Sequence, residues 1–263
     1  MNNLIMEYMV QIYLFIIGMI FGSFFNVCIF RIPNNQSISN PPSHCYNCSN
    51  RLKYIDLVPI LSWLYLNGKC RYCGQKISKR YPLIELLTGI LFLLVYNVYG
   101  LDIIILYYLV LISILIIVTF IDIDHYIIPD RIIIFGIIFS VIFNLTGKGI
   151  QLKDSILGAL ICGGGMLILI NLIEFIVKKE VMGGGDIKLF FMSGLFLGVK
   201  GCILTILLSI YIGSIYGIGT IIYSKIKNNQ YNSIIPYGPF ISVSALITVL
   251  CGTNIINWYM GLF

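Results

Sequence analysis

The sequence predicts an all-α polytopic membrane protein with about eight transmembrane helices and a small cytoplasmic zinc-binding loop subdomain. Hydrophobic residues make up 59% of the chain and charged residues only 11%, whereas a soluble domain has about a quarter of its residues charged. The mean hydropathy of +0.94 agrees with this, because too few polar side chains are available to cover a surface that faces water. Four cysteines concentrated in one polar loop predict the subdomain.

Apolar runs that are long enough, or nearly so, to form membrane helices follow one another along the chain. We expect helices at residues 8–30, 82–100, 103–121, 131–146, 155–177, 187–199, 201–223 and 237–262. The first run lacks the basic start and the small-residue cleavage site of a secretory signal, so it is expected to stay as a helix. The expected segments are a first transmembrane helix within 1–30, a cytoplasmic cysteine loop over 31–81 and a polytopic membrane domain over 82–263.

The basic residues predict which side of the membrane each loop faces. Eight of the seventeen Lys and Arg residues lie in the 31–81 loop, and loops rich in positive charge face the cytoplasm. Threading eight helices from this loop places six more basic residues on the same side and leaves three on the other: Lys148, Lys153 and Lys200. Both termini are then expected outside. This sidedness, with anionic lipid headgroups as partners of the basic loop, accounts for the net charge of +6 without nucleic acid.

The 31–81 loop holds two C-x-x-C pairs, Cys45 with Cys48 and Cys70 with Cys73. Two short thiolate pairs with twenty-one residues between them are typical of a tetrahedral zinc site. The first alternative is two disulfides, which a reducing cytoplasm disfavours; the second is a redox pair, which does not explain why there are two. Four thiolates leave no open position for water, so we expect the Zn²⁺ to be structural rather than catalytic.

A carboxylate stands in an unusual place in "VMGGGDIKLF" (181–190), where Asp186 follows three glycines and precedes an apolar run. The simplest interpretation is a helix N-cap after a turn. The segment "FIDIDHYIIPDR" (120–131) supplies a second carboxylate, Asp122, which the threading places at the same cytoplasmic depth. Carboxylates at the ends of apolar helices are expensive, so they indicate a functional site.

Asp122 and Asp186 together predict aspartyl-protease chemistry. If the two carboxyl groups converge and share a proton, one activates water and the other donates to the substrate carbonyl, and no metal is needed. Three glycines before the second aspartate would let a substrate backbone approach closely: Gly183, Gly184 and Gly185.

Three other carboxylates near the cytoplasmic face are expected to have structural roles. Asp130 follows a proline and precedes an apolar run, so it is interpreted as a helix cap. Glu85 and Glu174 lie near cytoplasmic helix ends, where pairing with a basic neighbour is the simpler account.

In their order along the chain, these motifs resemble the type IV prepilin peptidases, also called leader peptidase/N-methyltransferases, of the GxGD class of intramembrane aspartyl proteases. The motifs are "GSFFNVCIFRIP" (22–33), the two C-x-x-C pairs, "GKCRYCGQKISKRYPLIELLTG" (68–89), "DIDHYIIPD" (122–130) and "GGGDIKL" (183–189). Their joint occurrence is specific, whereas "GGGD" alone would be a weak signal.

The resemblance implies an enzyme of the bacterial cytoplasmic membrane that cuts the basic leader from prepilin or pseudopilin precursors after a glycine, at the cytoplasmic face. It also implies that the enzyme then methylates the new N-terminal residue with S-adenosylmethionine. The family's catalytic pair carries over to Asp122 and Asp186. Its cysteine loop, the region associated with N-methyltransferase activity, carries over to the four zinc-ligand candidates: Cys45, Cys48, Cys70 and Cys73.

The methyltransferase half rests on the resemblance alone, because the chain has no G-x-G-x-x-G that follows a strand. We expect this activity in the loop and around four residues that precede it: Gly22, Ser23, Asn26 and Arg31. The chain departs from the family at Tyr46, where proline is common, and at "DLVP" (56–59), where "DNIP" is common. Neither departure touches the zinc ligands.

Two other functions fit part of the pattern. A proton- or ion-coupled transporter would also use membrane carboxylates, but it favours carboxylates near the middle of the bilayer and inverted repeats. A non-enzymatic membrane adaptor with a zinc loop would explain the cysteines but not the two aspartate motifs. Motif order and predicted topology together favour the peptidase.

Overall fold

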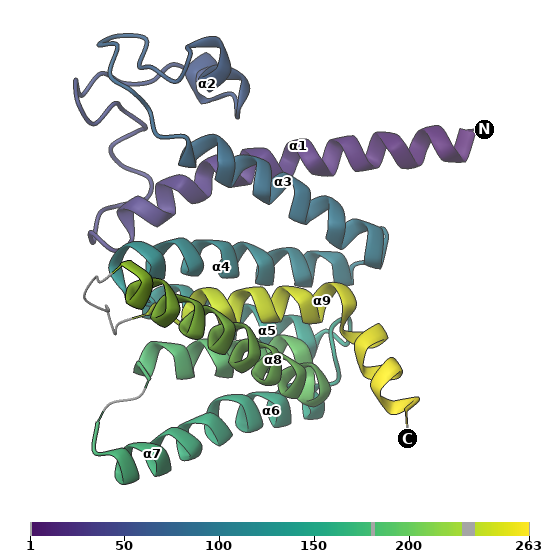
Figure 1. Ribbon diagram of the computed structural model, residues 1–263. Helices are drawn as coiled ribbons and strands as arrows, with labels where there is room; N and C mark the ends of the chain where they lie inside the picture. The colour runs from purple at the N-terminus through teal and green to yellow at the C-terminus, as the bar shows by residue number, and fades with distance from the viewer. Residues whose placement is uncertain (1, 180–181, 228–234, 263) are drawn as a thin grey trace. The chain divides into compact units, whose positions relative to one another are not determined.

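The computed structural model describes residues 2–179, 182–227 and 235–262, and all regular elements within these ranges are helices (Figure 1). In chain order they are α1 (Asn2–Arg31), a 3-10 helix (Tyr54–Leu57), α2 (Leu61–Tyr65), α3 (Arg80–Tyr99), α4 (Ile104–His125), α5 (Asp130–Leu145), α6 (Leu152–Ala159), a π-helix (Leu160–Gly165), α7 (Met166–Val177), α8 (Gly184–Lys227) and α9 (Gly238–Met260). The all-α prediction is confirmed.

Six helical runs in the described part of the chain are long and apolar enough to cross a membrane. They are α1, α3, α4, the continuous run that joins α6 to α7, α8 and α9. The 44 residues of α8 hold two helices joined at Gly198, and α5 is a further apolar helix of only 16 residues. Counting α5 and both parts of α8 gives the eight helices that the sequence predicts, and the chain is a multi-pass membrane protein.

The break inside α8 falls at the boundary expected between 187–199 and 201–223. Gly198 has a φ of 67°, a region that glycine adopts without the steric cost of a Cβ atom. A Cβ there would also overlap the carboxylate of Asp154, whose Oδ1 accepts the Val199 N–H at 3.2 Å. Asp154 therefore satisfies a donor that the second part of α8 would otherwise leave unpaired.

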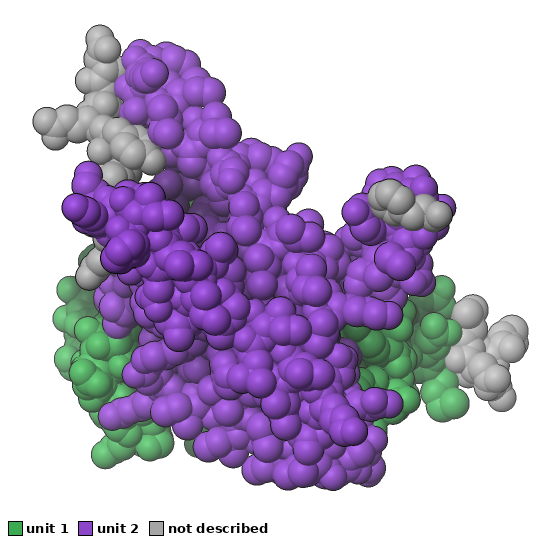
Figure 2. All heavy atoms as spheres, turned by 90° about the horizontal axis from the view of Figure 1, so that it is seen from below, with its two compact units in different colours: residues 1–105 green, residues 106–263 purple. Residues whose placement is uncertain are grey.

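The described chain forms two compact units, Met1–Ile105 and Leu106–Phe263, which Figure 2 draws in separate colours. In the first unit, α1 and α3 approach each other at a glycine. A Cβ at Gly22 would lie 2.7 Å from the Cα of Glu85, so only glycine permits this approach. The predicted segments 1–30, 31–81 and 82–263 were defined by function rather than by compactness, so they stay a prediction.

A buried polar cluster joins four helices of the second unit. The Tyr107 hydroxyl of α4 donates to the Leu195 carbonyl of α8 at 2.9 Å and accepts from Asn144 Nδ2 of α5 at 3.0 Å. The Ser155 hydroxyl of α6 donates to the same carbonyl at 2.7 Å. Between membrane helices, such bonds add specificity to van der Waals packing, so this cluster fixes how the helices that carry the second site are aligned.

Candidate functional site

The four loop cysteines converge as predicted for a metal site. Their Sγ atoms all lie within 4.8 Å of one another, and those of Cys45 and Cys73 are 3.8 Å apart. A tetrahedral zinc ion with Zn–S bonds of about 2.3 Å requires sulfur atoms about 3.8 Å apart. None of the four thiols is in a disulfide. The donor set and its spacing therefore fit a structural Zn²⁺.

The cysteines lie on two hooks with equivalent backbones, the first hook (residues 44–51) and the second hook (residues 69–76). An isolated bridge pairs the two ends of each hook. In each, the N–H of the first cysteine donates to the carbonyl five residues later: Cys45 to Asn50 at 3.0 Å and Cys70 to Gln75 at 2.8 Å. Ser49 and Gly74, one residue after the second cysteine of each hook, both have positive φ, 56° and 69°.

Backbone N–H groups favour the charged form of Cys45 and Cys73. The N–H of Gln75 lowers the pKa of Cys73 to about 7, and the N–H of Cys48 lowers the pKa of Cys45. For Cys48 the Asn50 N–H acts in the same direction, but burial and the neighbouring cysteine thiols outweigh it and raise the pKa of Cys48 to about 11. Because the thiolate is the form that binds zinc, Cys45 and Cys73 are prepared for a metal ion, whereas binding would have to displace the proton of Cys48.

A carboxylate ties the 3-10 helix to the second hook. Asp56 accepts a hydrogen bond and ion pair from Arg71 Nε at 2.6 Å and another bond from the Lys53 N–H at 3.1 Å. Burial alone would raise the pKa of Asp56, but these donors lower it below its ordinary value. The charged Asp56 thus stabilises the loop around the cysteines.

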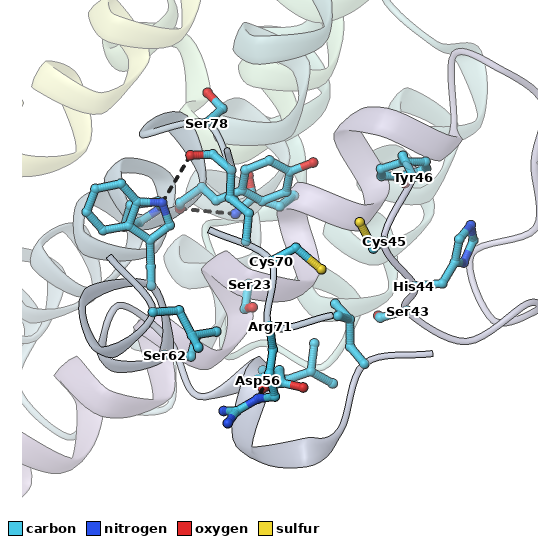
Figure 3. Close-up of a pocket in the computed structure, with 18 of the residues that line it drawn as sticks. Ser23, Ser43, His44, Cys45, Tyr46, Asp56, Ser62, Cys70, Arg71 and Ser78 are labelled. Carbon is cyan, nitrogen blue, oxygen red and sulfur yellow. Dashed lines mark hydrogen bonds and ion pairs between the residues drawn. The ribbon is translucent and has the colours of Figure 1, made fainter. Parts of the chain in front are cut away.

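A cavity of about 480 Å³ lies within the first unit, between the hooks, α1 and α3 (Figure 3). Ser23, Asn26 and Arg31, three of the four residues predicted for methyl transfer, line it together with Cys45 and Cys70. The fourth predicted residue, Gly22, instead allows α1 and α3 to pack closely. The volume falls within the range of about 300–1,000 Å³ that is typical of small-molecule sites.

Two of these polar residues shape the cavity wall. Arg31 is 4% exposed, and its Nη1 donates to the carbonyls of Ser37 at 2.9 Å and Ile38 at 3.2 Å. Asn26 Nδ2 donates to the Tyr81 carbonyl at 3.2 Å, where α3 begins. Arg31 therefore fixes the start of the loop, and Asn26 fixes the start of α3. Direct contact of either residue with a ligand stays a prediction.

Glu85 is a further lining residue, and it is only 7% exposed. Its Oε2 accepts the Ile60 N–H at 2.7 Å, and its carboxylate also hydrogen-bonds the Ser23 hydroxyl. Among the residues that the structure describes, no Lys, Arg or His side chain pairs with it. The expectation of a basic neighbour is therefore wrong for Glu85.

The two predicted catalytic aspartates lie in the second unit and interact electrostatically. Asp122, on the last turn of α4, is 5% exposed, and its Oδ2 accepts the Gly238 N–H at 2.9 Å. A Cβ at Gly238 would lie 2.8 Å from the same oxygen. The first residue of α9 thus approaches the carboxylate closely because it has no side chain.

Asp186 is half-buried and is the third residue of α8, not the residue that precedes the helix, so the N-cap interpretation is wrong. Its N–H donates to the Gly183 carbonyl at 3.1 Å, and its carboxylate folds back toward that glycine. Gly185 packs on Ile128, from which a Cβ would be 3.0 Å away, while a Cβ at Gly184 would meet nothing within 4 Å. Gly185 therefore packs against a neighbouring side chain, whereas Gly184 faces open space.

Asp130 does not act as the cap of α5. It is the first residue of the helix, and its Oδ1 pairs with Lys188 Nζ at 2.7 Å. Both side chains are more than half exposed, at 61% and 54%. An ion pair this accessible to water contributes little stability, so the pair serves as a control for the buried aspartates.

Comparison with known proteins decides the family. Residues 16–99 match the Bacterial Peptidase A24 N-terminal domain, and residues 109–218 match the Type IV leader peptidase family. A protein of Bacillus subtilis named Prepilin leader peptidase/N-methyltransferase is 36% identical, over 94% of this chain and 96% of its own length. This chain belongs to the type IV leader peptidase family.

Other relatives of the same name support the family membership across nearly the whole chain. A protein of Legionella pneumophila is 33% identical over 99% of this chain and 98% of its own length. A protein of Aeromonas hydrophila is 33% identical over 95% of this chain and 93% of its own length. No solved structure is a significant match. The two family matches divide the sites, because the cysteines fall in the first and both aspartates in the second.

Sequence reasoning missed two residues that support the sites of this family member. Gly238 lies 116 residues from Asp122 in the chain, and it contributes a main-chain N–H rather than a side chain. Its neighbours in "YGPF" (237–240), a Gly-Pro step before an apolar run, were the available signal of a tight approach. Ile60, which holds Glu85, carries no such signal, because its contribution is also a backbone N–H.

Proposed function

We propose that this chain is a membrane aspartyl endopeptidase that removes the basic leader of type IV prepilin-like proteins, and that it then methylates the new N-terminal residue. The family membership supports both activities. The observation that carries the peptidase assignment is the electrostatic interaction of Asp122 and Asp186, two carboxylates at the ends of apolar helices. Carboxylates in such places are rare without a functional reason.

The proposed cleavage uses the two aspartates as one unit. Two interacting carboxyl groups can share a proton, because charging both at once is costly. The charged one takes a proton from water as the water oxygen attacks the substrate carbonyl, and the protonated one donates to the carbonyl oxygen. The Gly238 N–H orients Asp122 by its bond to Oδ2. The open side of Gly184 leaves room for a substrate backbone.

The proposed methyl transfer takes place in the cavity of the first unit. S-adenosylmethionine would supply the methyl group, and the size of the cavity suits a ligand of this class. Ser23 offers a hydroxyl there, while Asn26 and Arg31 hold the walls. A Zn²⁺ ion on the four cysteines would fix the hooks, two of whose cysteines, Cys45 and Cys70, line the cavity.

The proposed orientation puts both sites on the cytoplasmic side of the bacterial cytoplasmic membrane and both termini outside. The distribution of Lys and Arg between alternate loops supports it. The basic 31–81 loop would then lie near anionic lipid headgroups. The substrate class follows the name that the relatives carry, and a prepilin leader cut at the cytoplasmic face matches this orientation.

Cleavage of a prepilin in membranes that contain wild type or single variants tests the peptidase. Asp122→Asn and Asp186→Asn keep the shape of the side chain and remove its titrating proton. Each should lower the cleavage rate by about 10³-fold or more, because a general acid–base pair acts as a unit. Asp130→Asn is the matched control and should cleave like wild type. Cleavage that survives in Asp186→Asn would contradict the dyad.

A further inference from the structure

The cavity of the first unit contains a buried carboxylate to which the proposed chemistry has assigned no role. Glu85 lines this cavity with 7% of its surface exposed. Its two hydrogen-bond donors, the Ile60 N–H and the Ser23 hydroxyl, are both neutral. Burial of a carboxylate is costly, and neutral donors offset only part of that cost. A cation bound inside the cavity would offset the remaining cost of burying the Glu85 carboxylate.

Three cationic side chains line the cavity, those of Arg31, Arg71 and Lys76, and none of them forms an ion pair with Glu85 among the described residues. Arg31 donates to two carbonyls, and Arg71 pairs with Asp56. Asp56 and Glu85 are the two carboxylates of the lining, and only the first is neutralised by a cationic side chain among the described residues. The negative charge available to a ligand is therefore that of Glu85.

The backbone that supports Glu85 is held in a costly conformation. Ile60 has φ 60° and ψ −51°, and a β-branched residue with positive φ is a true outlier. Such residues persist where the surroundings hold them in place, and they cluster at ligand sites. Here the outlier directs its N–H at Glu85 Oε2 at 2.7 Å, so the carboxylate is fixed in position before any ligand binds.

We propose that Glu85 binds a primary ammonium group inside this cavity. The inference rests on the proposed methyl transfer, which brings two such groups to the site: the α-ammonium of the methyl donor and that of the newly cleaved chain. An ammonium group is the complement of a carboxylate with neutral donors, because it supplies the missing charge and up to three N–H donors.

If the ammonium is that of the cleaved chain, Glu85 also acts as the base that accepts a proton from it. The ammonium gives one proton to the carboxylate and becomes an amine with a free electron pair. The nitrogen then forms a bond to the methyl carbon as the C–S bond of the sulfonium donor breaks, and that electron pair stays on the sulfur. Glu85 releases its proton to water, and the secondary amine keeps the new positive charge.

Glu85→Gln tests the proposal, because the amide keeps the size and the hydrogen bonds of the carboxylate and removes its charge. The full-length protein in nanodiscs is assayed for cleavage and for methylation of the product by mass spectrometry. Methylation should fall at least about tenfold, since bonds to charged groups are worth about 1.5–3 kcal/mol. Cleavage should stay within about twofold, because Glu85 is not part of the aspartate pair. Glu7→Gln is the matched control, because Glu7 is an exposed carboxylate of α1 in the same unit and does not line the cavity, and it should keep methylation within about twofold.

Binding of S-adenosylhomocysteine, measured by calorimetry, distinguishes the two sources of ammonium. Weaker binding to Glu85→Gln assigns Glu85 to the donor, whereas unchanged binding with a raised KM for the cleaved chain assigns it to that chain. Methylation within about twofold of wild type in Glu85→Gln overturns the proposal, and so does an equal loss in Glu7→Gln. A wild type that cleaves without methylating would instead contradict the proposed methyltransferase.

A ligand-side experiment covers the case in which Glu85→Gln does not fold. Wild type is titrated with S-adenosylhomocysteine and its analogue without the amine, and with a cleaved peptide and its N-acetylated form. Loss of the amine from one of the two ligands should weaken its binding at least about tenfold. Equal affinity within both pairs would overturn the proposal.

Discussion

The two units each bury one carboxylate on a backbone N–H, but what surrounds the two carboxylates differs. Asp122 in the second unit accepts a hydrogen bond from the N–H of Gly238 and interacts electrostatically with a second carboxylate, Asp186. Glu85 in the first unit takes the N–H of Ile60 and lies beside a cavity, with neutral donors only. A carboxylate that interacts with another carboxylate is suited to share a proton, whereas one that lines a cavity is suited to receive a cation.

The sharpest test of this comparison is to disable one unit and measure the other. Asp186→Asn should lower cleavage by about 10³-fold or more. Methylation of a synthetic chain that already lacks its leader should continue at the wild-type rate, because the cavity is complete within the first unit. Mass spectrometry of both products measures this. A parallel loss of both activities would show that the two sites are not separate.

Removal of the metal should have the next largest effect, on the other activity. Cys70→Ser combined with Cys73→Ser should abolish zinc binding and lower methylation by about tenfold or more, because the hooks form part of the cavity wall. Cleavage should fall much less. Zinc content and both rates are measured together. Cys251→Ser, at an exposed cysteine of α9, is the control and should change neither. A greater loss of cleavage than of methylation would contradict a purely structural role beside the cavity.

A single methyl group near Asp122 should have an intermediate effect. Gly238→Ala places a Cβ 2.8 Å from Asp122 Oδ2, so the carboxylate must shift. A shift of this kind should lower cleavage by about 10–100-fold and leave methylation unchanged. Gly217→Ala in α8, where a Cβ would meet nothing within 4 Å, is the matched control. A fully active Gly238→Ala variant would show that the close approach of α9 is not needed.

The smallest effect is expected at Asp56, and it depends on pH. Because Arg71 and the Lys53 N–H lower the pKa of Asp56 against the effect of burial, its charge stabilises the loop above the ordinary carboxyl pKa. That stability is lost as the pH falls through the lowered value. Asp56→Asn should therefore reduce the thermal stability of the loop at neutral pH, and the difference from wild type should shrink in acid. Cleavage should stay within about twofold at neutral pH, because Asp56 belongs to the first unit and the aspartate pair to the second. A difference that grows in acid would contradict the sign of the shift.

Local patterns predicted much of the fold. Apolar runs placed the helices, including the break inside α8 at Gly198, and the C-x-x-C spacing placed the four thiols in one cluster. What local patterns could not predict are contacts made by backbone atoms far apart in the chain. The N–H groups of Gly238 and Ile60 belong to this class, since any residue but proline has the same donor. The Asp130–Lys188 pair was missed for a related reason, because its partners are 58 residues apart.

The equivalent backbones of the two hooks separate two kinds of constraint on the sequence. The cysteine positions are the ones that a tetrahedral zinc ion would require. The residues between them differ, with Tyr46 and Asn47 in the first hook and Arg71 and Tyr72 in the second. Of these four, Tyr46, Asn47 and Arg71 face the cavity. The lining can therefore change by point substitution, and the selectivity of the cavity can diverge among descendants, while the metal-binding framework stays as it is.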